Sequence, residues 1–318
     1  TSFEIVVKDN KISFYVAVPD KIRDFIEQQI HAQYPHAQID EQDDYNMFAP
    51  TGVVLGSHLT LRRSNAFPIK TYRKLESDPL NSITNALSKV TGMDGVAIQY
   101  IVRSSQKSWR AEGVRIAREM QQGKKLSQVH KGGIASTVGK ELKSFASTSK
   151  PSEKKSDEPY RLTPLEEEMV KGLEEKASKA GLDVNVRIIV SASDAQKAQR
   201  YLNDILGAYG QYNIYEFGNS FSKSQPRFQS TLVRHFIYRH FDERVRIVLN
   251  AEEMASLYHM PLSTTETPKI DWLLSRRALP PTNLPNEGLL LGHSEYRGHD
   301  YQIRMKAQDR RRHTYIIG

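Results

Sequence analysis

The stretch FEIVVKDNKISFYVAV, residues 3–18, predicts the first two strands of an antiparallel sheet. In its second half, Ile12, Phe14 and Val16 alternate with small or polar residues, and this period of two is typical of a strand with one buried face. The segment KDNK, residues 8–11, separates the two apolar runs and supplies the turn. The chain therefore opens with two adjacent strands.

The next hundred residues extend this pair into an α+β unit. Residues 19–34 predict a helix capped by Asp20, with apolar side chains on one face: Ile22, Phe25, Ile26, Ile30 and Tyr34. Further strands are predicted at residues 36–46, 57–64, 67–75 and 95–103, and a second helix at 78–90. The order strand, helix, strands, helix, strand is the split βαβ plan of a ferredoxin-like domain.

A composition change marks the end of this unit. Residues 109–122 predict a helix, so the first domain is placed at residues 1–122. Residues 123–159 contain seven Ser, eight Lys and four Gly, with Phe145 as the one aromatic residue. This composition is typical of a flexible basic linker, which could bind phosphates but more commonly serves as a solvated spacer.

The same plan follows at residues 160–262, with a helix added in front. Thr163 caps that helix, Pro164 occupies its first turn and Gly181 ends it. Strands are predicted at 182–193, 212–217 and 244–250, and helices at 194–210 and after the capping residue Asn250. Residues 230–241, STLVRHFIYRHF, fit a strand or a helix, and the strand is favoured. The predicted fold is α+β: two ferredoxin-like units with antiparallel sheets.

Residues 263–318 form a connector region. The segment ALPPTNLP, residues 278–285, predicts extended chain, and a β-hairpin across RGHD, residues 297–300, precedes one last apolar strand. That strand runs into Gly318. A strand leading to glycine is how the phosphate-binding loop G-x-x-x-x-G-K-[ST] begins, so Gly318 is a candidate for its first glycine. Alone, this pattern is weak, because many loops between a strand and a helix contain glycine.

The segment QDRRRHTYIIG, residues 308–318, resembles the sequence before the phosphate-binding loop in type IV secretion and conjugation ATPases of the HerA–FtsK superfamily. The matching positions are Asp309, Arg310, His313, Ile316, Ile317 and Gly318. Residues 2–35, LNAEEMASLYHMP and GLLLG also look like the amino-terminal region of conjugation-type ATPases. The resemblance implies a hexameric parent that hydrolyses ATP with Mg²⁺, associates with membrane or secretion components and moves DNA.

Within residues 1–318 the resemblance implies no catalysis and no cofactor, since the loop lysine is not included. The expected role is therefore that of an assembly or anchoring region, cytoplasmic and held at the inner face of the membrane by another segment. Residues 263–318 would lead into the first strand of the motor domain. Arg310, Arg311, Arg312 and His313 could contact a neighbouring subunit or DNA, although a solvated turn is also commonly basic.

The second candidate function is a stand-alone nucleic-acid-binding protein. The chain carries 45 Lys and Arg against 37 Asp and Glu, which gives a net charge of +8. Arg234, Tyr238 and Arg239 mix basic and aromatic side chains that could contact nucleic acid, or could belong to a half-buried strand. Cysteine is absent, and the histidines show no metal-binding spacing, so no metal site is predicted.

Overall fold

The computed structural model describes residues 1–35, 37–49, 51–124, 126, 161–262, 265, 267–270, 272, 280–296 and 299–312. The chain divides into two compact units. The larger comprises Thr1–Ala17 and Asn46–Ile270, and the smaller comprises Val18–Tyr45 and Asp271–Gly318. Most of the predicted linker at 123–159 lies outside the described residues. In the described part of the chain, no helix has the length and apolar character needed to cross a bilayer.

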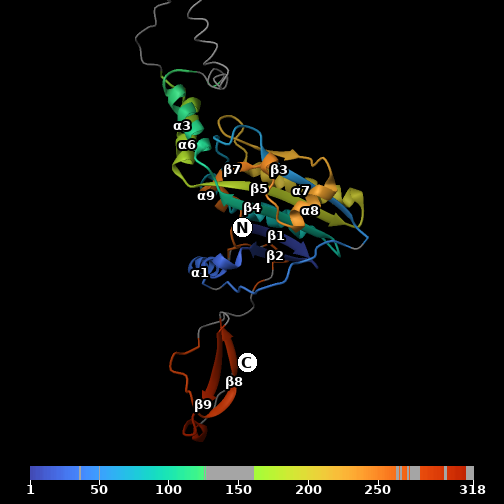
Figure 1. The fold of residues 1–318 in the computed structure, drawn as a ribbon, viewed down its shortest axis with the longest axis vertical. Helices are drawn as coiled ribbons and strands as arrows, with labels where there is room; N and C mark the ends of the chain where they lie inside the picture. Colours follow the sequence, from blue (N-terminus) through green and yellow to red (C-terminus); the bar gives the residue numbers. More distant parts are fainter. Residues whose placement is uncertain are drawn as a thin grey trace, which may run out of the picture. The chain divides into compact units, whose positions relative to one another are not determined.

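One seven-stranded sheet forms the centre of the larger unit (Figure 1). Its order is β2-β1-β4-β5-β3-β6, and β7 also pairs with β5. Neighbouring strands run antiparallel. The strands are β1 (Ser2–Lys8), β2 (Lys11–Ala17), β3 (Val53–Leu61), β4 (Gly95–Ser104), β5 (Gly181–Ala192), β6 (Phe221–Ser224) and β7 (Ile247–Asn250).

The predicted α+β class with antiparallel pairing is confirmed, but the two predicted units do not have separate sheets. Strands from residues 1–122 and strands from residues 160–262 belong to one sheet. The two parts are joined by β4 and β5, which pair from Gly95↔Ser191 to Ser104↔Leu182. Both strands are buried along most of their length. Two separate sheets would leave these apolar edges unpaired, whereas joining them satisfies the backbone donors and acceptors.

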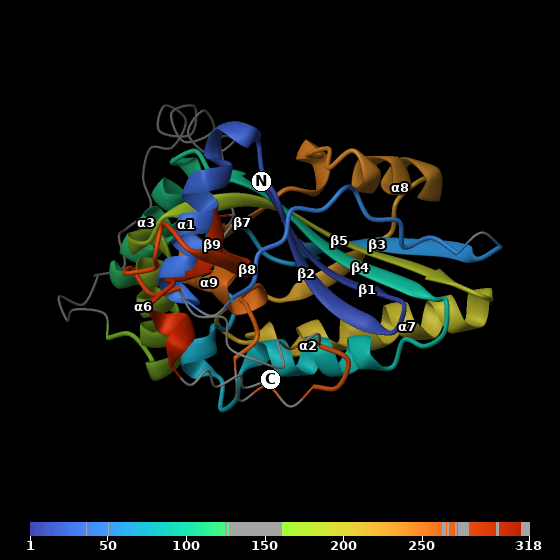
Figure 2. The same cartoon turned by 90° about the horizontal axis from the view of Figure 1, so that it is seen from below.

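The main apolar core lies on one face of this sheet. It contains the alternating residues Val184, Val186, Ile188 and Val190 of β5. Helices α2 (Pro79–Ser88), α7 (Ala195–Ala208) and α9 (Ala251–Leu257) contribute to this core. Figure 2 shows α2 and α7 on one side of the sheet and α8 (Gln229–Ile237) on the other.

A second apolar cluster joins α3 (Ser108–Gln121) to α6 (Pro164–Ser178), with Ile116, Leu173 and Phe67 at its centre. The predicted start of α6 is confirmed. The Thr163 side chain accepts a hydrogen bond from the Glu166 backbone N–H, the Glu166 carboxylate accepts one from the Thr163 N–H, and Pro164 occupies the first turn.

Several predicted strands are wrong. Residues 229–237 form helix α8, in which Leu232 and Phe236, four residues apart, are both buried. Residues 67–75 contain a short 3₁₀ turn (η2, Tyr72–Lys74), and the Ile69 N–H donates to the Glu253 carboxylate rather than to a strand. Neither residues 37–46 nor residues 212–217 form a strand; beside the latter, the sheet takes β6.

The smaller unit contains helix α1 (Arg23–Gln33) and a hairpin of β8 (Leu289–Tyr296) and β9 (His299–Met305). The hairpin prediction is confirmed. The predicted Asp20 cap is wrong, because Asp20 lies inside a 3₁₀ turn (η1, Asp20–Ile22) and α1 has no side-chain cap. A further 3₁₀ turn (η6, Asp309–Arg311) follows the hairpin, and the predicted last strand at 314–317 lies outside the described residues.

Candidate functional site

Beneath α8, the second face of the sheet carries a line of polar side chains. Strand register places six of them in adjacent cross-strand positions, so they share one face. We call this line the polar row; from β2 to β6 it consists of Tyr15, Glu4, Gln99, Arg187, His58 and Ser224. Glu4, Gln99 and Arg187 are completely buried, and His58 is 5% exposed. Buried polar groups of this kind require partners, which α8 and the following loop provide.

Arg187 ties the carboxyl end of α8 to the sheet. Its Nη1 donates to Gln99 Oε1 at 2.8 Å and to the His235 carbonyl at 3.3 Å. Its Nη2 donates to Asn185 Oδ1 at 3.2 Å and to the His240 carbonyl. Burial lowers the pKa of Arg187 to about 10, while the Asp242 and Glu4 charges oppose this shift, so the guanidinium remains charged near neutral pH.

Arg239 forms the second tether between this loop and the row. Its backbone has φ of 48°, in the left-handed region, which turns the chain back toward the sheet directly after α8. The guanidinium then donates to Glu4 Oε1 at 2.9 Å, while Gln99 Nε2 donates to the same oxygen at 2.9 Å. The buried carboxylate of Glu4 is therefore compensated by both charge and hydrogen bonds.

Histidine at position 58 is held neutral in this row. Burial, and after it the neighbouring Arg187 charge, lowers the pKa of His58 to about 4. His58 Nδ1 and Arg187 Nε are buried without a hydrogen-bond partner in the part of the chain that the structure describes. The two residues are direct cross-strand partners, so these two groups belong to neighbouring side chains of the polar row.

Asp242 anchors the end of the loop that follows α8. Hydrogen bonds from the Arg244 guanidinium hold the pKa of Asp242 well below its usual range. The Asp242 backbone N–H donates to Asn185 Oδ1 at 2.6 Å, and Asn185 Nδ2 donates to the Asp242 carbonyl at 2.9 Å. Burial lowers the pKa of nearby His235, and the His240 and Arg187 charges add to this effect. These contacts fix α8 and its loop in one position on the sheet.

The structure separates the three residues predicted for nucleic-acid contact. Arg234 and Tyr238 lie four residues apart, so they share one face of α8 at its carboxyl end, and both are exposed; Tyr238 is 77% exposed. Arg239 instead points inward to Glu4. Tyr238 does not point inward as a half-buried strand would require, whereas Phe236 is buried, but within helix α8 rather than a strand.

Two further residues on this surface were missed from the sequence. Arg227 and Phe228 directly precede α8, both are exposed, and the Arg227 guanidinium lies 5.4 Å from the centre of the Phe228 ring. The sequence feature that could have identified Arg227 and Phe228 is an excess of positive charge in the surrounding segment. Residues 220–241 contain four Lys or Arg and no Asp or Glu. We call Arg227, Phe228, Arg234 and Tyr238 the outer face of α8.

The remaining predicted site residues lie at the carboxyl end of the chain. Arg310 and Arg311 belong to the η6 turn, Arg312 follows it, and all three are exposed. His313 and Gly318 lie outside the described residues, so the predicted phosphate-loop glycine stays a prediction.

His235 and His240 lie close together, with ring centres 4.6 Å apart. Within the described ranges, no group of three or more His, Cys, Asp or Glu side chains is arranged to hold a metal ion.

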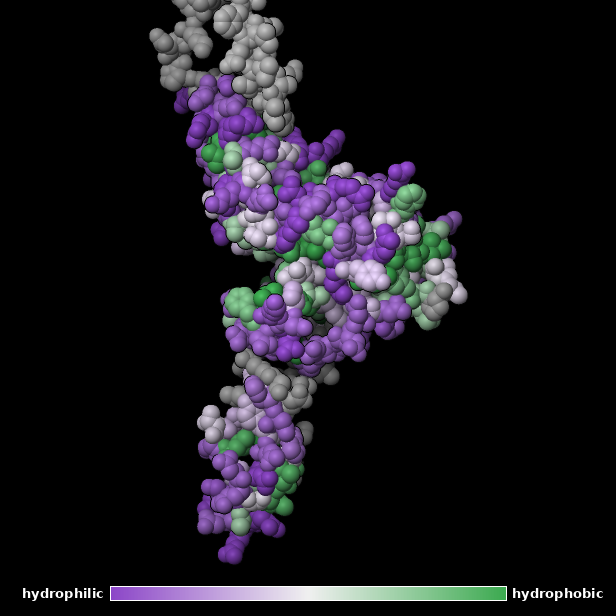
Figure 3. Space-filling view, viewed as in Figure 1, coloured by the Kyte–Doolittle hydropathy of each residue, from purple (hydrophilic) through white to green (hydrophobic). Residues whose placement is uncertain are grey.

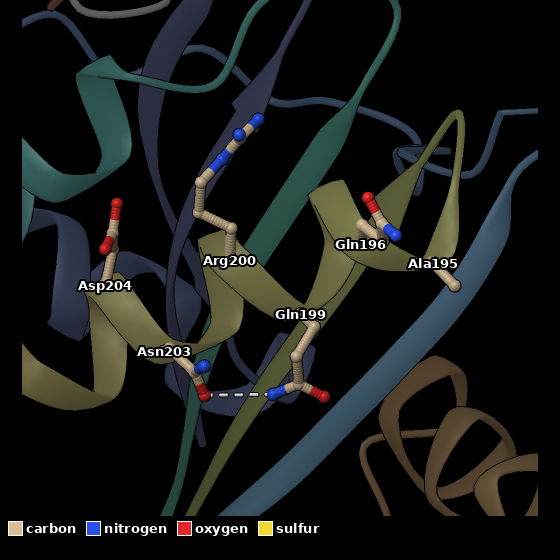
Figure 4. A pocket seen from close by; sticks show the side chains of 6 residues that line it. All are labelled: Ala195, Gln196, Gln199, Arg200, Asn203 and Asp204. Carbon is tan, nitrogen blue, oxygen red and sulfur yellow. Dashed lines mark hydrogen bonds between the residues drawn. The ribbon is translucent and has the colours of Figure 1, made fainter.

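The surface depressions have simple linings. One of about 560 Å³ is lined by side chains of helix α7, with Gln199 donating to Asn203 at 2.9 Å (Figure 4). Another of about 320 Å³ lies between the end of α7 and strands β3 and β6, and its lining includes Tyr209, Asn213 and Phe221. Neither lining combines a nucleophile with a general base.

Comparison with known proteins gives one family. No curated protein and no solved structure matches the chain. A family model described as a domain of unknown function, DUF8128, matches residues 1–273, which include the whole seven-stranded sheet, the polar row and α8. Because this match covers most of the chain, the protein belongs to the DUF8128 family.

Proposed function

We propose that this chain is the non-catalytic amino-terminal region of a type IV secretion or conjugation ATPase, with an assembly or anchoring role. The observation that carries the proposal is the resemblance of residues 308–318 to the segment before the phosphate-binding loop of such motors. The DUF8128 match ends at residue 273, ahead of the ALPPTNLP connector at 278–285, and does not include the motor-like segment.

A rigid platform suits this role physically. A motor that moves a polymer must be held against a fixed body, because otherwise nucleotide-driven motion turns the motor instead of moving its load. The larger unit offers a continuous sheet with an apolar core on one face and directional polar contacts on the other. In this proposal the parent is a hexamer that binds ATP and Mg²⁺ beyond residue 318. It works at the inner face of the membrane with secretion components and moves DNA.

The decisive experiment begins with the codons that follow Gly318 in the gene. They are expected to encode a second glycine followed by Lys and Ser or Thr, at the spacing of the phosphate-binding loop. The longer protein should hydrolyse ATP and form hexamers by mass photometry, and alanine in place of the loop lysine should abolish hydrolysis. A stop codon or an unrelated sequence at this point would refute the proposal.

The second candidate, a stand-alone nucleic-acid-binding protein, is favoured by the acid-free segment at residues 220–241. Its predicted basic linker at 123–159 lies largely outside the described residues. A salt titration of DNA binding separates the candidates, since tight binding with a steep salt dependence by residues 1–318 alone favours the second.

A further inference from the structure

We propose that the outer face of α8 binds single-stranded nucleic acid, with arginines on the phosphates and aromatic rings on the bases. This inference concerns a binding surface of the DUF8128 domain itself and requires no motor domain. It rests on the second candidate function, nucleic-acid binding, and names the surface that would carry it. Its failure would leave the phosphate-loop expectation unaffected, because the codons after Gly318 test that expectation separately.

The first argument is unbalanced charge. Neither Arg227 nor Arg234 has an ion-pair partner among the residues that the structure describes, although both are exposed. Other exposed arginines of the larger unit differ in this respect: Arg103 contacts Asp183 and Glu243, whereas Arg62 and Arg200 likewise have no ion-pair partner among the described residues. The carboxylates nearest α8 in the fold do not compensate the outer face, because Glu4 binds Arg239 and Asp242 binds Arg244. Unpaired guanidinium groups favour a polyanionic ligand.

The second argument is the placement of the aromatic rings. Phe228 is the first flanking residue of α8 and is 60% exposed, and Tyr238 is the last flanking residue and is 77% exposed. Phe228 and Tyr238 are ten residues apart, which separates them by about 15 Å along the helix at 1.5 Å per residue. That span matches about four nucleotides of a stacked strand at 3.4 Å each. Exposed rings beside arginines are the arrangement that stacks unpaired bases, whereas bases inside a duplex are not accessible to them.

The third argument is the polar surface that continues on the same face of the sheet. Thr60 and Ser222 are cross-strand partners on β3 and β6, and Thr60 Oγ1 donates to the Ser222 carbonyl at 3.3 Å. Ser222 is exposed, and so is Arg62, which follows β3. Hydroxyl and guanidinium groups are common phosphate contacts. Figure 3 shows that the side of the larger unit seen in Figure 1, where α8 is labelled, is mostly hydrophilic with smaller apolar areas.

A lipid surface fits these observations less well. A helix that lies on a membrane buries a continuous apolar face, whereas the apolar residues of α8, Leu232 and Phe236, already pack beneath it. On the outer face, the aliphatic side chain that accompanies the rings is Ile237, at 44% exposure. We therefore commit to nucleic acid and keep the membrane as an outcome of the test.

The test measures binding of residues 1–318 to a fluorescent 20-nucleotide oligo(dT) between 50 and 300 mM salt. Tyr238→Ala and Phe228→Ala should each weaken binding about 5- to 150-fold, because stacking contributes about 1 to 3 kcal/mol per base. Arg234→Gln and Arg227→Gln should each reduce the slope of log K against log salt by about 0.7.

Two matched controls lie on the opposite side of the sheet. Arg200→Gln removes an exposed arginine from α7, and Tyr72→Ala removes an aromatic side chain that is 46% exposed. Both should leave the affinity and the salt slope unchanged. The proposal is overturned if oligo(dT) does not bind, if the controls weaken binding as much as the α8 variants, if duplex DNA binds as tightly as the single strand, or if phosphatidylserine vesicles bind and DNA does not.

Discussion

Replacing Lys176 by methionine should cost about 3 kcal/mol of unfolding free energy. The ammonium group is completely buried and contacts Glu253 at 3.1 Å, and it also donates to the carbonyls of Phe67 and Val248, both at 3.1 Å. It joins α6, the loop before η2, β7 and α9. Burial lowers the pKa of Lys176, and Glu253 opposes that shift. Methionine preserves the volume but leaves a buried carboxylate without its cation.

The size of this loss in unfolding free energy depends on the hydrogen bonds that Glu253 retains without Lys176. Removing one member of a buried ion pair typically costs about 3 to 5 kcal/mol. Here Glu253 still accepts from the backbone N–H groups of Ile69 at 2.9 Å and Asn250 at 2.8 Å, so we expect the lower end of that range. With a urea slope of about 2 kcal/mol per molar, the unfolding midpoint should fall by about 1.5 M.

Urea unfolding followed by circular dichroism measures this shift, with Lys179→Met as the matched control. Lys179 is on the same helix end, is 28% exposed at its side chain and pairs with Glu252, so its loss should cost less than about 1 kcal/mol. The double variant Lys176→Met/Glu253→Gln should lose less stability than the sum of its single variants, because no unpaired charge remains. If Lys176→Met and Lys179→Met shift the midpoint equally, the reasoning about the buried pair is wrong.

Three further predictions concern α8 and α9. Acidification from pH 6.5 to 4 should lower the free energy of unfolding by about 3 kcal/mol. The pKa of His58 is about 4 in the folded protein, so in this pH range the unfolded chain binds the proton more tightly than the folded one. Urea midpoints at pH 7 and pH 4.5 measure the loss, and the difference between these two midpoints should be smaller in His58→Gln than in the unchanged protein. Gly56→Ala should cost about 1 to 3 kcal/mol in the same assay, because a Cβ there would lie 2.5 Å from Leu232 Cδ2 and 2.9 Å from the Ile188 carbonyl oxygen. Asn250→Ala should lower stability by about 1 kcal/mol, since Asn250 Oδ1 accepts from the Glu253 N–H at 2.8 Å at the start of α9, and Asn250→Ser should restore most of it.

Local signals in the sequence located most of the elements. The turn at residues 8–11 and the alternation after it place β1 and β2, and the caps at Thr163 and Asn250 place the starts of α6 and α9. These predictions depend on interactions between residues close in the chain, so the sequence contains the whole interaction. The same holds for the hairpin of β8 and β9.

The arrangement of the sheet could not be predicted in this way. Pairing of β4 with β5 joins residues 95–104 to residues 182–191, across the segment expected to be a linker. The sequence of each strand indicates only that the strand is buried. It contains no local signal for which other strand it pairs with. The prediction of a strand at residues 230–241 was wrong for another reason. Leu232, Val233, Phe236 and Ile237 fit a helical face, while the β-branched and aromatic residues around them favour a strand, and the burial that decides between the two comes from the sheet.

The polar row was hidden because its β5 member Arg187 and the nearby Asn185 alternate with the apolar residues Val184, Val186 and Ile188 along the strand. That alternation ordinarily places polar side chains in solvent. Here the polar side is covered, and both residues are completely buried. Predicting residues 230–241 as a strand removed helix α8, the element that covers this face. One wrong element therefore hid both the buried row and the surface above it.

The contacts beneath α8 bear directly on the surface above it. An apolar interface lets a helix slide or rotate at little cost, whereas hydrogen bonds fix direction as well as distance. Arg187 holds the carbonyls of His235 and His240, and Gln229 exchanges two hydrogen bonds with the Gly56 backbone at the other end of α8. Both ends of the helix are thus fixed, and Arg234 and Tyr238 are presented in one orientation. Removing a hydrogen bond beneath α8 should therefore reduce the preference for single-stranded over duplex DNA. Changing a side chain of the outer face of α8 should lower the affinity for nucleic acid without altering the fold.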